Sequence, residues 1–252
     1  MDRTIISDLA HAEHPVAAPL DDETVNRLLR LALDDQRSVL DLGCGDGTWL
    51  LRALRRDRRL RAVGVDISGA GFDRVQAEAE QAGLSPGLEL HQADAQEWTS
   101  SERFDVVLSI GATHAFGGLI PTLAAAGEHL RPGGRLLIGE CFWEQAPSEE
   151  MLSLLRAEPE DYEDVAGTVA AVTAAGWVPL QGHVSSLQEW DAYEWSWTGS
   201  LTRWAADHPQ HPDSAEILGV ATEHRRIWLE GYRGTLGFLT LLLAPPPADL
   251  HD

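Results

Sequence analysis

Three glycines and an acid occur together in Val39–Gly47, where the sequence reads VLDLGCGDG. Glycines let the backbone pass close to a ligand, and free amide groups at the start of a helix can bind polar atoms. The G-x-G-x-G spacing differs from the G-x-G-x-x-G spacing of sheets that bind dinucleotides. Asp41 precedes these glycines and would repel a pyrophosphate, whereas it would attract a cationic amino-acid group. The segment therefore predicts a binding loop that favours a positively charged ligand.

Two more acids follow apolar runs further along the chain. Asp66 stands in GVDIS and Asp94 stands in QADAQEW. An acid at the end of the second strand of a nucleoside-binding sheet accepts hydrogen bonds from the ribose hydroxyls, and Asp94 could accept from the adenine amino group. A helix N-cap or a solvated loop would explain any single acid of this kind. Three acids at the ends of three successive predicted strands favour a nucleoside site.

These acids can meet only if strands and helices alternate in a parallel sheet. Short apolar runs predict strands, and apolar residues at intervals of three and four predict helices. The predicted strands are 38–42, 61–67, 88–93, 104–110, 135–140, 177–186 and 237–244. The predicted helices are 21–33, 48–56, 71–82, 119–130, 147–158, 162–175 and a long stretch, 188–231, broken near 208–212. The alternation over the first five strands predicts a sheet covered by helices on both faces.

Composition excludes several classes of protein. The formal net charge is −21, from 19 basic and 40 acidic side chains, and this balance opposes nucleic-acid binding, which relies on basic residues. The basic run Arg52–Arg61 is interpreted as the solvated face and end of a helix. No lysine occurs in the sequence, which excludes a Schiff-base lysine, a pyridoxal phosphate lysine and a P-loop lysine.

The two cysteines, Cys44 and Cys141, have no ligand-like spacing around them, so we expect neither a structural disulfide nor a metal site. No run approaches the roughly 20 apolar residues that cross a bilayer. The first residues, MDRTIISDLAHAEHP, lack the apolar core of a signal peptide. We therefore expect a cytoplasmic protein with no metal, no membrane partner and no nucleic-acid partner.

The order of these segments resembles the class I S-adenosylmethionine-dependent methyltransferase family. VLDLGCGDG is similar to the first motif of the family, GVDIS to the second, ADAQEW to the third, FDVVLSI to the fourth, and LRPGGRLLIGE to the segment that ends in the fifth strand. The resemblance covers residues 35–145. It implies an α/β fold with a doubly wound, seven-stranded, mostly parallel sheet whose last strand, GFLTLLLA, is antiparallel. It also implies S-adenosylmethionine as the methyl donor and S-adenosylhomocysteine as the product.

Three further segments, IGATHAFGG, GECFW and WDAYEWSW, together resemble a bacterial subgroup of small-molecule methyltransferases that is mostly uncharacterised, and HPVAAPLD resembles it less specifically. We expect a single domain over 1–252. Its predicted parts are an N-terminal lid or helix over about 1–34, a cofactor-binding core over about 35–145, and helical cap insertions over about 144–160 and 187–234.

The resemblance and the predicted strand ends together define the residues expected to contact the cofactor. They are Asp41, Gly43, Gly45, Asp46, Asp66, Ile67, Asp94, Ala95, Ser109 and Ile110.

Methyl transfer from a sulfonium is an in-line displacement, in which positioning supplies most of the acceleration. A base is required only where the acceptor must lose a proton. His114, just beyond strand 104–110, is the first candidate, because imidazole groups exchange protons near neutral pH; ordering of its loop or contact with the cofactor would explain it equally well. Glu140 is the second candidate, as a base or as an anchor for a cationic substrate, although a solvent-facing strand end would also account for it.

Aromatic residues are concentrated in the predicted cap. Trp190, Tyr193 and Trp197 share one face of a predicted helix at spacings of three and four. Packing between the cap and the sheet accounts for most such stripes, and a cage for an amine or a flat aromatic acceptor is the alternative. The predicted acceptor pocket comprises Trp143, Tyr162, Trp190, Tyr193 and Trp197.

The sequence favours a methyltransferase with a small-molecule acceptor whose methylated atom is nitrogen, oxygen or carbon. A sheet that binds S-adenosylmethionine or S-adenosylhomocysteine without catalysis, as a sensor or partner subunit, is the alternative. An RNA or protein methyltransferase is disfavoured by the acidic composition. A nicotinamide-dependent dehydrogenase is disfavoured by the glycine spacing.

Overall fold

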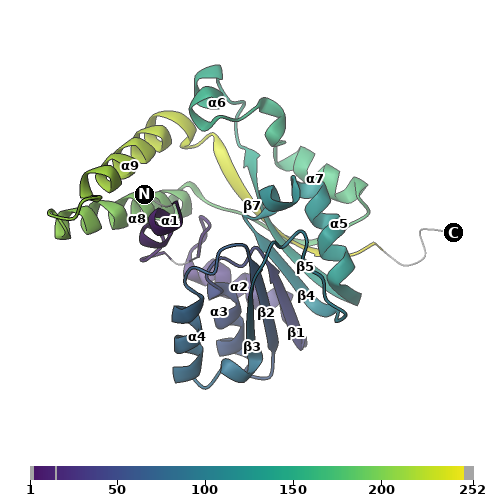
Figure 1. Cartoon of the computed structure of the whole chain (residues 1–252). Coiled ribbons are helices and arrows are strands. Elements are labelled where there is room, and N and C mark those ends of the chain that lie inside the picture. The colour runs from purple at the N-terminus through teal and green to yellow at the C-terminus, as the bar shows by residue number, and fades with distance from the viewer. Residues whose placement is uncertain (1–2, 15, 247–252) are drawn as a thin grey trace. The chain divides into compact units, whose positions relative to one another are not determined.

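The computed structural model of the chain describes residues 3–14 and 16–246 (Figure 1). The strands are β1 (Ser38–Leu42), β2 (Arg61–Asp66), β3 (Leu88–Gln92), β4 (Phe104–Ile110), β5 (Leu130–Trp143), β6 (Val178–Val184) and β7 (Leu236–Ala244). The α-helices are α1 (Arg3–Ala10), α2 (Asp22–Ala32), α3 (Thr48–Arg56), α4 (Phe72–Gln81), α5 (Leu119–His129), α6 (Glu149–Leu155), α7 (Val165–Ala174), α8 (Leu187–Asp207) and α9 (Ser214–Ile227). Short 3-10 helices are η1 (Ser85–Gly87), η2 (Thr113–Phe116) and η3 (Pro159–Asp161), and η4 (Trp228–Tyr232) is a π-helical turn.

The strands form a seven-stranded sheet in the order β3-β2-β1-β4-β5-β7-β6. β1 pairs in parallel with β2 and with β4, β3 pairs in parallel with β2, and β5 pairs in parallel with β4. β7 runs antiparallel to β6. This arrangement confirms the predicted doubly wound, mostly parallel fold. The strand order reverses between β1 and β4, and ligands of such sheets bind at the carboxyl ends of the strands beside this reversal.

Burial explains why the central strands form where they do. Every residue of β1 is buried, and Val39, Leu40 and Leu42 have no exposed surface, as expected for a strand with helices over both faces. α3 contacts β1, β2 and β3, whereas α5 contacts β4. Figure 1 shows α3 and α4 together on one side of these strands and α5 on the other. α2 begins where the side chain of Asp21 accepts a hydrogen bond from the Thr24 amide, an N-cap.

β5 begins five residues earlier than the sequence predicts. The segment RPGG was expected to separate a helix from strand 135–140, but β5 starts at Leu130, which pairs with Phe104. The register then shifts, so that Val106 pairs with Arg135. The four residues of RPGG are thus accommodated as a bulge inside the strand, where Gly133 has a φ of 77° that suits glycine.

The chain divides into two compact units. The sheet unit comprises Asp21–Glu140, Ala166–Val184 and Leu239–Asp252, and the helical unit comprises Met1–Leu20, Cys141–Val165 and Ser185–Phe238. Residues 1, 2 and 15 of the predicted N-terminal lid and residues 247–252 lie outside the described residues. The predicted single domain, its lid and its cap boundaries stay a prediction.

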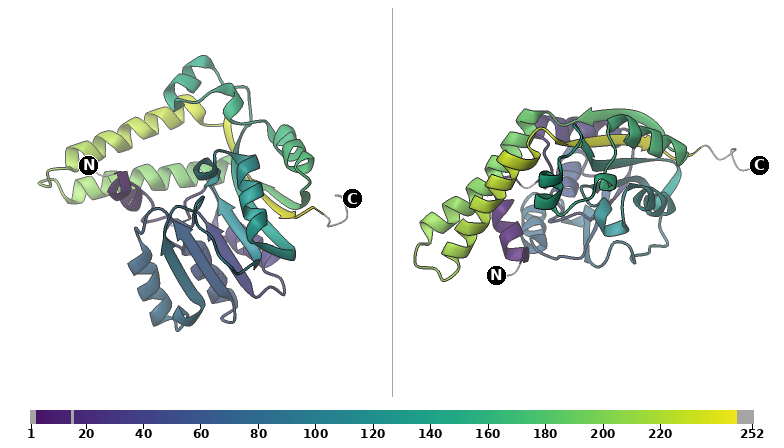
Figure 2. Two further views of the ribbon diagram at one scale, coloured as in Figure 1. Left: turned by 45° about the vertical axis from the view of Figure 1, so that its right-hand side comes forward. Right: turned by 90° about the horizontal axis from the view of Figure 1, so that it is seen from above.

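Within the helical unit, α8 and α9 lie side by side, in green and yellow-green in both views of Figure 2. α8 begins with a capping box in which Ser186 and Glu189 satisfy each other's backbone amides. Ala10 of α1 joins residues of α8 and α9 in a buried apolar cluster, which consists of Ala10, Leu201, Ala205, Ile217 and Ala221. Within the described part of the chain, none of the helices is long and apolar enough to cross a membrane.

Gly64 of β2 provides a test of how tightly the sheet unit is packed. A Cβ atom at Gly64 would lie 2.7 Å from Leu50 Cδ1 and 2.8 Å from both Cys44 Sγ and Leu90 Cδ2. We expect Gly64→Ala to reduce the free energy of unfolding by roughly 1–3 kcal/mol, because overpacked cores must displace their neighbours. Guanidinium unfolding followed by circular dichroism measures this change.

The matched control is Gly219→Ala, at an exposed position of α9 where the added atom would meet nothing within 4 Å. Alanine is a better helix former than glycine by about 1 kcal/mol, so this variant should be at least as stable as the parent. Equal midpoints for Gly64→Ala and the parent protein would contradict the packing argument.

Candidate functional site

The glycine loop connects β1 to α3 and lies against the ends of two neighbouring strands. Gly43, Gly45 and Gly47 all have positive φ, at 80°, 56° and 87°. The amides of Gly43 and Cys44 donate to the carbonyl of Val65 in β2, at 2.9 and 3.1 Å. A Cβ atom at Gly43 would lie 2.4 Å from the Cβ of Ala112, just beyond β4. The ends of β1, β2 and β4 therefore meet at this loop.

Two of the predicted acids contact the loop directly. Asp66 Oδ2 accepts from the Gly45 amide at 2.9 Å, and its Oδ1 accepts from the Ser68 amide at 2.8 Å. Asp46 Oδ1 accepts from the Thr48 amide at 2.8 Å, and Oδ2 forms an ion pair with Arg74. Asp46 thus stabilises the first turn of α3. The carboxylate of Asp66 is held in one orientation and retains acceptor positions for a ligand.

Asp41 is the most unusual acid of the loop region. It is 2% exposed, and the described part of the chain gives its carboxylate no hydrogen-bond donor. Burial, together with the smaller effect of the charges of Asp66 and Asp46, raises the pKa of Asp41 to about 7. A buried acid without a donor and beside two other acids is complementary to a cationic group.

The remaining predicted cofactor contacts lie at the ends of β2, β3 and β4. The Ala93 amide donates to the carbonyl of Asp66 at 2.8 Å, which places the loop containing Asp94 beside the end of β2. Asp94 Oδ1 accepts from the Gln96 amide at 2.9 Å. The Ile67 side chain is 72% exposed, a large apolar surface next to the acids. Among the others, Ala95 and Ser109 are buried and Ile110 is half-buried.

His114 follows the end of β4, whereas Glu140 lies inside the adjacent strand β5, which runs on to Trp143 beyond the predicted end at residue 140. The Gly111 amide donates to the Gly139 carbonyl at 3.0 Å and joins the chain after β4 to β5 next to Glu140. His114 lies in η2 and is exposed. No residue in the described ranges forms a hydrogen bond with its imidazole. Glu140 is half-buried at the junction of the two units in the chain. The structure therefore provides His114 with no carboxylate that would orient a catalytic imidazole.

The aromatic residues predicted for the acceptor pocket all lie in the helical unit. Trp143 packs edge-on against Tyr162, with ring centroids 5.3 Å apart, and its Nε1 donates to the Pro159 carbonyl at 2.9 Å. Trp190 packs edge-on against Tyr193 at 6.4 Å. Trp197 stacks on His224 at 3.9 Å. Packing within the unit thus accounts for much of the surface of these rings.

Three polar residues that the sequence did not single out lie among these rings. Glu194 is 2% exposed. Its Oε2 lies 2.8 Å from His224 Nε2, and its Oε1 accepts from the Tyr232 hydroxyl at 2.6 Å. Tyr232 also packs against Trp190, with centroids 6.1 Å apart. Glu194 and His224 lie at equal sequence distances on either side of Pro209, where the predicted helix breaks. If the two halves pack side by side after this break, residues at equal distances from it lie opposite one another, and this spacing could have predicted the contact.

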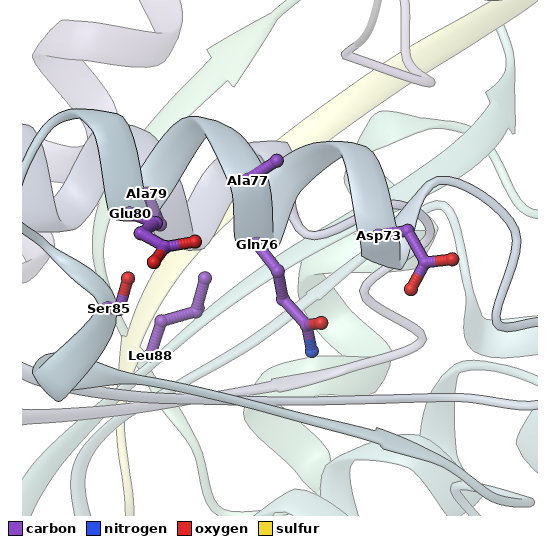
Figure 3. Close-up of a pocket in the computed structure, with 7 residues that line it drawn as sticks. All are labelled: Asp73, Gln76, Ala77, Ala79, Glu80, Ser85 and Leu88. Atoms are coloured by element: carbon purple, nitrogen blue, oxygen red, sulfur yellow. The ribbon is translucent and has the colours of Figure 1, made fainter.

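A surface groove of about 480 Å³ lies along α4 (Figure 3). Its lining combines the acids Asp73 and Glu80 with the apolar side chain of Leu88. It contains none of the predicted site residues. Across residues 3–14 and 16–246, no three His, Cys, Asp or Glu side chains gather closely enough to hold a metal ion.

Known proteins share both the sequence pattern and the fold. A family model for a methyltransferase domain matches residues 39–134. A methyltransferase from Geobacter sulfurreducens, in complex with S-adenosyl-L-homocysteine, has a TM-score of 0.86 and 26% identity, covering 96% of this chain and 98% of that chain. Uncharacterized protein YjhP from Escherichia coli K12 is 28% identical over 222 residues, 86% of this chain and 88% of YjhP. Trans-aconitate 2-methyltransferase from Azoarcus sp. BH72 is 32% identical over 168 residues, 65% of this chain and 63% of that enzyme.

These matches confirm the predicted resemblance to the class I S-adenosylmethionine-dependent methyltransferases. The predicted cofactor, S-adenosylmethionine, and the predicted enzyme class are thereby confirmed. The likeness supports a small-molecule acceptor.

The raised pKa of Asp41 predicts a pH-dependent stability. The folded state holds the proton up to about pH 7, whereas the unfolded chain releases it near 3.8, so this group lowers the free energy of unfolding as pH rises from about 4 to about 7. Asp41→Asn removes the buried charge. We expect it to raise the melting temperature at pH 8 and to leave it unchanged at pH 4, with a maximum gain of about 4 kcal/mol.

Differential scanning calorimetry of the variant and the parent protein between pH 4 and pH 8 measures this difference. Asp34→Asn, at an exposed position, is the control and should follow the parent at every pH. A lower melting temperature for Asp41→Asn at pH 8 would contradict the assignment of Asp41 as a destabilising buried charge.

Proposed function

We propose that the chain methylates a small-molecule acceptor and that the acids around its glycine loop hold the donor. When bound, the cofactor supplies a methyl group attached to a positively charged sulfur. One observation carries the proposal: the buried Asp41 carboxylate receives no hydrogen bond from residues 3–14 and 16–246 and stands beside Asp66 and Asp46. An ammonium group at this place would offset the cost of burying the charge.

The other residues fit a nucleoside with an amino-acid tail. A Cβ atom at Gly45 would meet nothing within 4 Å, so the backbone there is open to a ligand. Asp66 is oriented by two amides and would accept hydrogen bonds from the ribose hydroxyls. Asp94 would accept from the adenine amino group, and the exposed side chain of Ile67 would provide an apolar surface for the adenine ring. Gly43, Asp46, Ala95, Ser109 and Ile110 complete the proposed contacts.

The methylated atom of the acceptor is nitrogen, oxygen or carbon. An acceptor that carries a proton on this atom needs a group to take it, and His114 and Glu140 are the candidates next to the strand ends. Trp143, Tyr162, Trp190, Tyr193 and Trp197 are the proposed acceptor contacts of the helical unit. Their rings provide flat apolar surfaces for a small organic molecule.

The role of Asp41 predicts how cofactor binding depends on pH. Below about pH 7 the free protein holds a proton on Asp41, and the ligand's ammonium must displace it. The dissociation constant of S-adenosylhomocysteine should therefore be flat above pH 7 and rise by up to about tenfold per pH unit below it. Isothermal titration calorimetry between pH 5.5 and pH 8.5 measures this profile.

Asp41→Asn should bind the ligand weakly and lose the pH dependence, while the exposed-site control Asp34→Asn should match the parent. A dissociation constant that does not change over this pH range would contradict the pairing of Asp41 with the ammonium group.

A product assay tests the function directly. Purified protein is incubated with methyl-labelled S-adenosylmethionine and a fractionated metabolite extract, and label and S-adenosylhomocysteine are followed by mass spectrometry. We expect label in a low-mass product. Tight cofactor binding without a labelled product from any fraction would favour the sensor or partner-subunit alternative, and label in protein or RNA would overturn the small-molecule acceptor.

A further inference from the structure

One face of the α8–α9 pair in the helical unit consists of two rows of residues. In each row, five residues follow one another at alternating intervals of three and four, so they share one side of their helix. Leu229, the last of them, lies in η4, which continues α9. These ten residues, called the two-row face below, are Ala192, Trp195, Gly199, Thr202 and Ala206 of the first row and Ala215, Leu218, Thr222, Arg225 and Leu229 of the second.

Arg225 joins the two rows into one surface. Its guanidinium carbon lies over the Trp195 ring, 5.6 Å from the ring centroid, and its Nη2 donates to Thr202 Oγ1 at 3.0 Å. A different face of the pair is covered by α1, whose Ile6 and Leu9 pack against the buried apolar cluster of α8 and α9. The two-row face is therefore continuous across both helices and distinct from the contact with α1.

The two-row face exposes large apolar side chains. Trp195 is 52% exposed, Leu218 is 45% exposed and Leu229 is 47% exposed. The hydroxyls of Thr202 and Thr222 donate to carbonyls one turn earlier in their own helices, each at 2.8 Å, so neither hydroxyl needs a partner from outside. Single exposed apolar residues are common, whereas several on one face form the kind of patch that marks an interaction surface.

Charge is distributed unevenly around these helices. The chain has a formal net charge of −21, yet neither row contains an acid and Arg225 is the one charged member of the two-row face. The acids Glu216, Glu223 and Glu230 each follow a residue of the second row by one position, which places them about 100° around the helix. The two-row face is thus a surface on which two copies of this acidic chain can meet with little direct repulsion.

We propose that the two-row face is the interface of a homodimer, in which it packs against the same face of a second copy. A two-fold contact brings one surface patch against itself, so the patch must be complementary to itself. Leu218 lies four residues before Thr222, and Leu229 lies four residues after Arg225. Antiparallel packing of the second rows about an axis between Thr222 and Arg225 therefore sets Leu218 of each copy opposite Leu229 of the other.

The charges favour a second copy over other occupants. A basic protein would find no carboxylate in either row, and an anionic membrane surface would be repelled by the net charge of the chain. The surface that suits two rows of small, apolar and internally satisfied polar residues is another uncharged helical face. The two-row face of a second copy is such a surface.

The size of the two-row face sets the expected strength of the dimer. α9 has 14 residues and is about 21 Å long. With helix axes roughly 8–10 Å apart, the two rows present on the order of 400 Å² per copy, whereas a standard interface buries about 800 Å² per partner. We therefore expect a weak dimer with a dissociation constant of roughly 1–100 μM.

Sedimentation velocity of the full chain tests the dimer. Between about 2 and about 200 μM, the mass should rise from the 27.5 kDa of one chain towards twice that value. Raising sodium chloride from about 0.05 to about 0.5 M should tighten the dimer, because salt screens the repulsion between acidic copies and the contact contains no ion pair. A monomer at every concentration would overturn the proposal, as would a dimer that salt dissociates.

Two double variants test the antiparallel register. Leu218→Glu/Leu229→Glu sets like charges opposite one another at both leucine contacts and should weaken the dimer by about 100-fold or more. Leu218→Glu/Leu229→Arg sets each glutamate opposite an arginine and should weaken it by less than about tenfold. Equal dissociation constants for the two double variants would overturn the proposal, and so would a dimer that persists in Leu218→Glu/Leu229→Glu.

The matched control is Leu180→Glu/Leu187→Glu. It adds the same two charges at side chains of similar exposure, 49% and 45%, outside both rows, and it should dimerise like the parent protein after correction for the added net charge by measurement at high salt. All substituted side chains are exposed, so circular dichroism should show the parent's helix content in every variant. Binding of a monomeric parent protein to phosphatidylcholine vesicles, abolished by Leu218→Glu/Leu229→Glu, would assign the two-row face to a membrane and overturn the dimer.

Discussion

The close approach between Gly43 and Ala112 is the constraint on which the cofactor end of the sheet depends. A Cβ atom at Gly43 would stand 2.4 Å from the Ala112 Cβ, closer than two carbon atoms can pack. The φ of 80° at Gly43 adds a second reason for glycine. Because β1 and β4 are neighbours at the reversal of strand order, this contact brings the chain after β4 against the chain after β1. The amides that bind the Val65 carbonyl add β2 to the same junction.

The acids lie close together at this junction because each one follows or ends a strand. The glycines allow the ends of these strands to approach one another closely. Asp41 stands near the end of β1 and Asp66 at the end of β2, and the Asp66 carbonyl holds the start of the loop that contains Asp94. Burial, and after it the repulsion from Asp66 and Asp46, raises the pKa of Asp41. The loop and the sheet therefore maintain an arrangement that is electrostatically unfavourable in the free protein and that a cationic ligand would relieve.

This part of the site could be predicted from the sequence because its signals are local. A short apolar run followed by an acid identifies a strand end, and parallel pairing brings such ends to one edge of the sheet. The Glu194, His224 and Tyr232 cluster has no local signal, since its members are 30 and 38 residues apart and meet only through packing of α8 on α9. The start of β5 at Leu130 was not predicted for a related reason. RPGG has the composition of a turn, and it lies within a strand because the residues on both sides of it pair with β4.

Asp41 and Glu194 are equally buried, at 2% exposure, but their surroundings differ. Asp41 has no donor in the described part of the chain and lies beside other acids, so the partner that it lacks is best supplied from outside, by a ligand. Glu194 has two hydrogen-bond partners inside the protein, His224 and Tyr232, so its carboxylate is already satisfied without a ligand. The degree of burial does not distinguish the two acids, whereas the hydrogen-bond partners do: Asp41 is suited to pairing with a cationic ligand, and Glu194 is already paired within the protein.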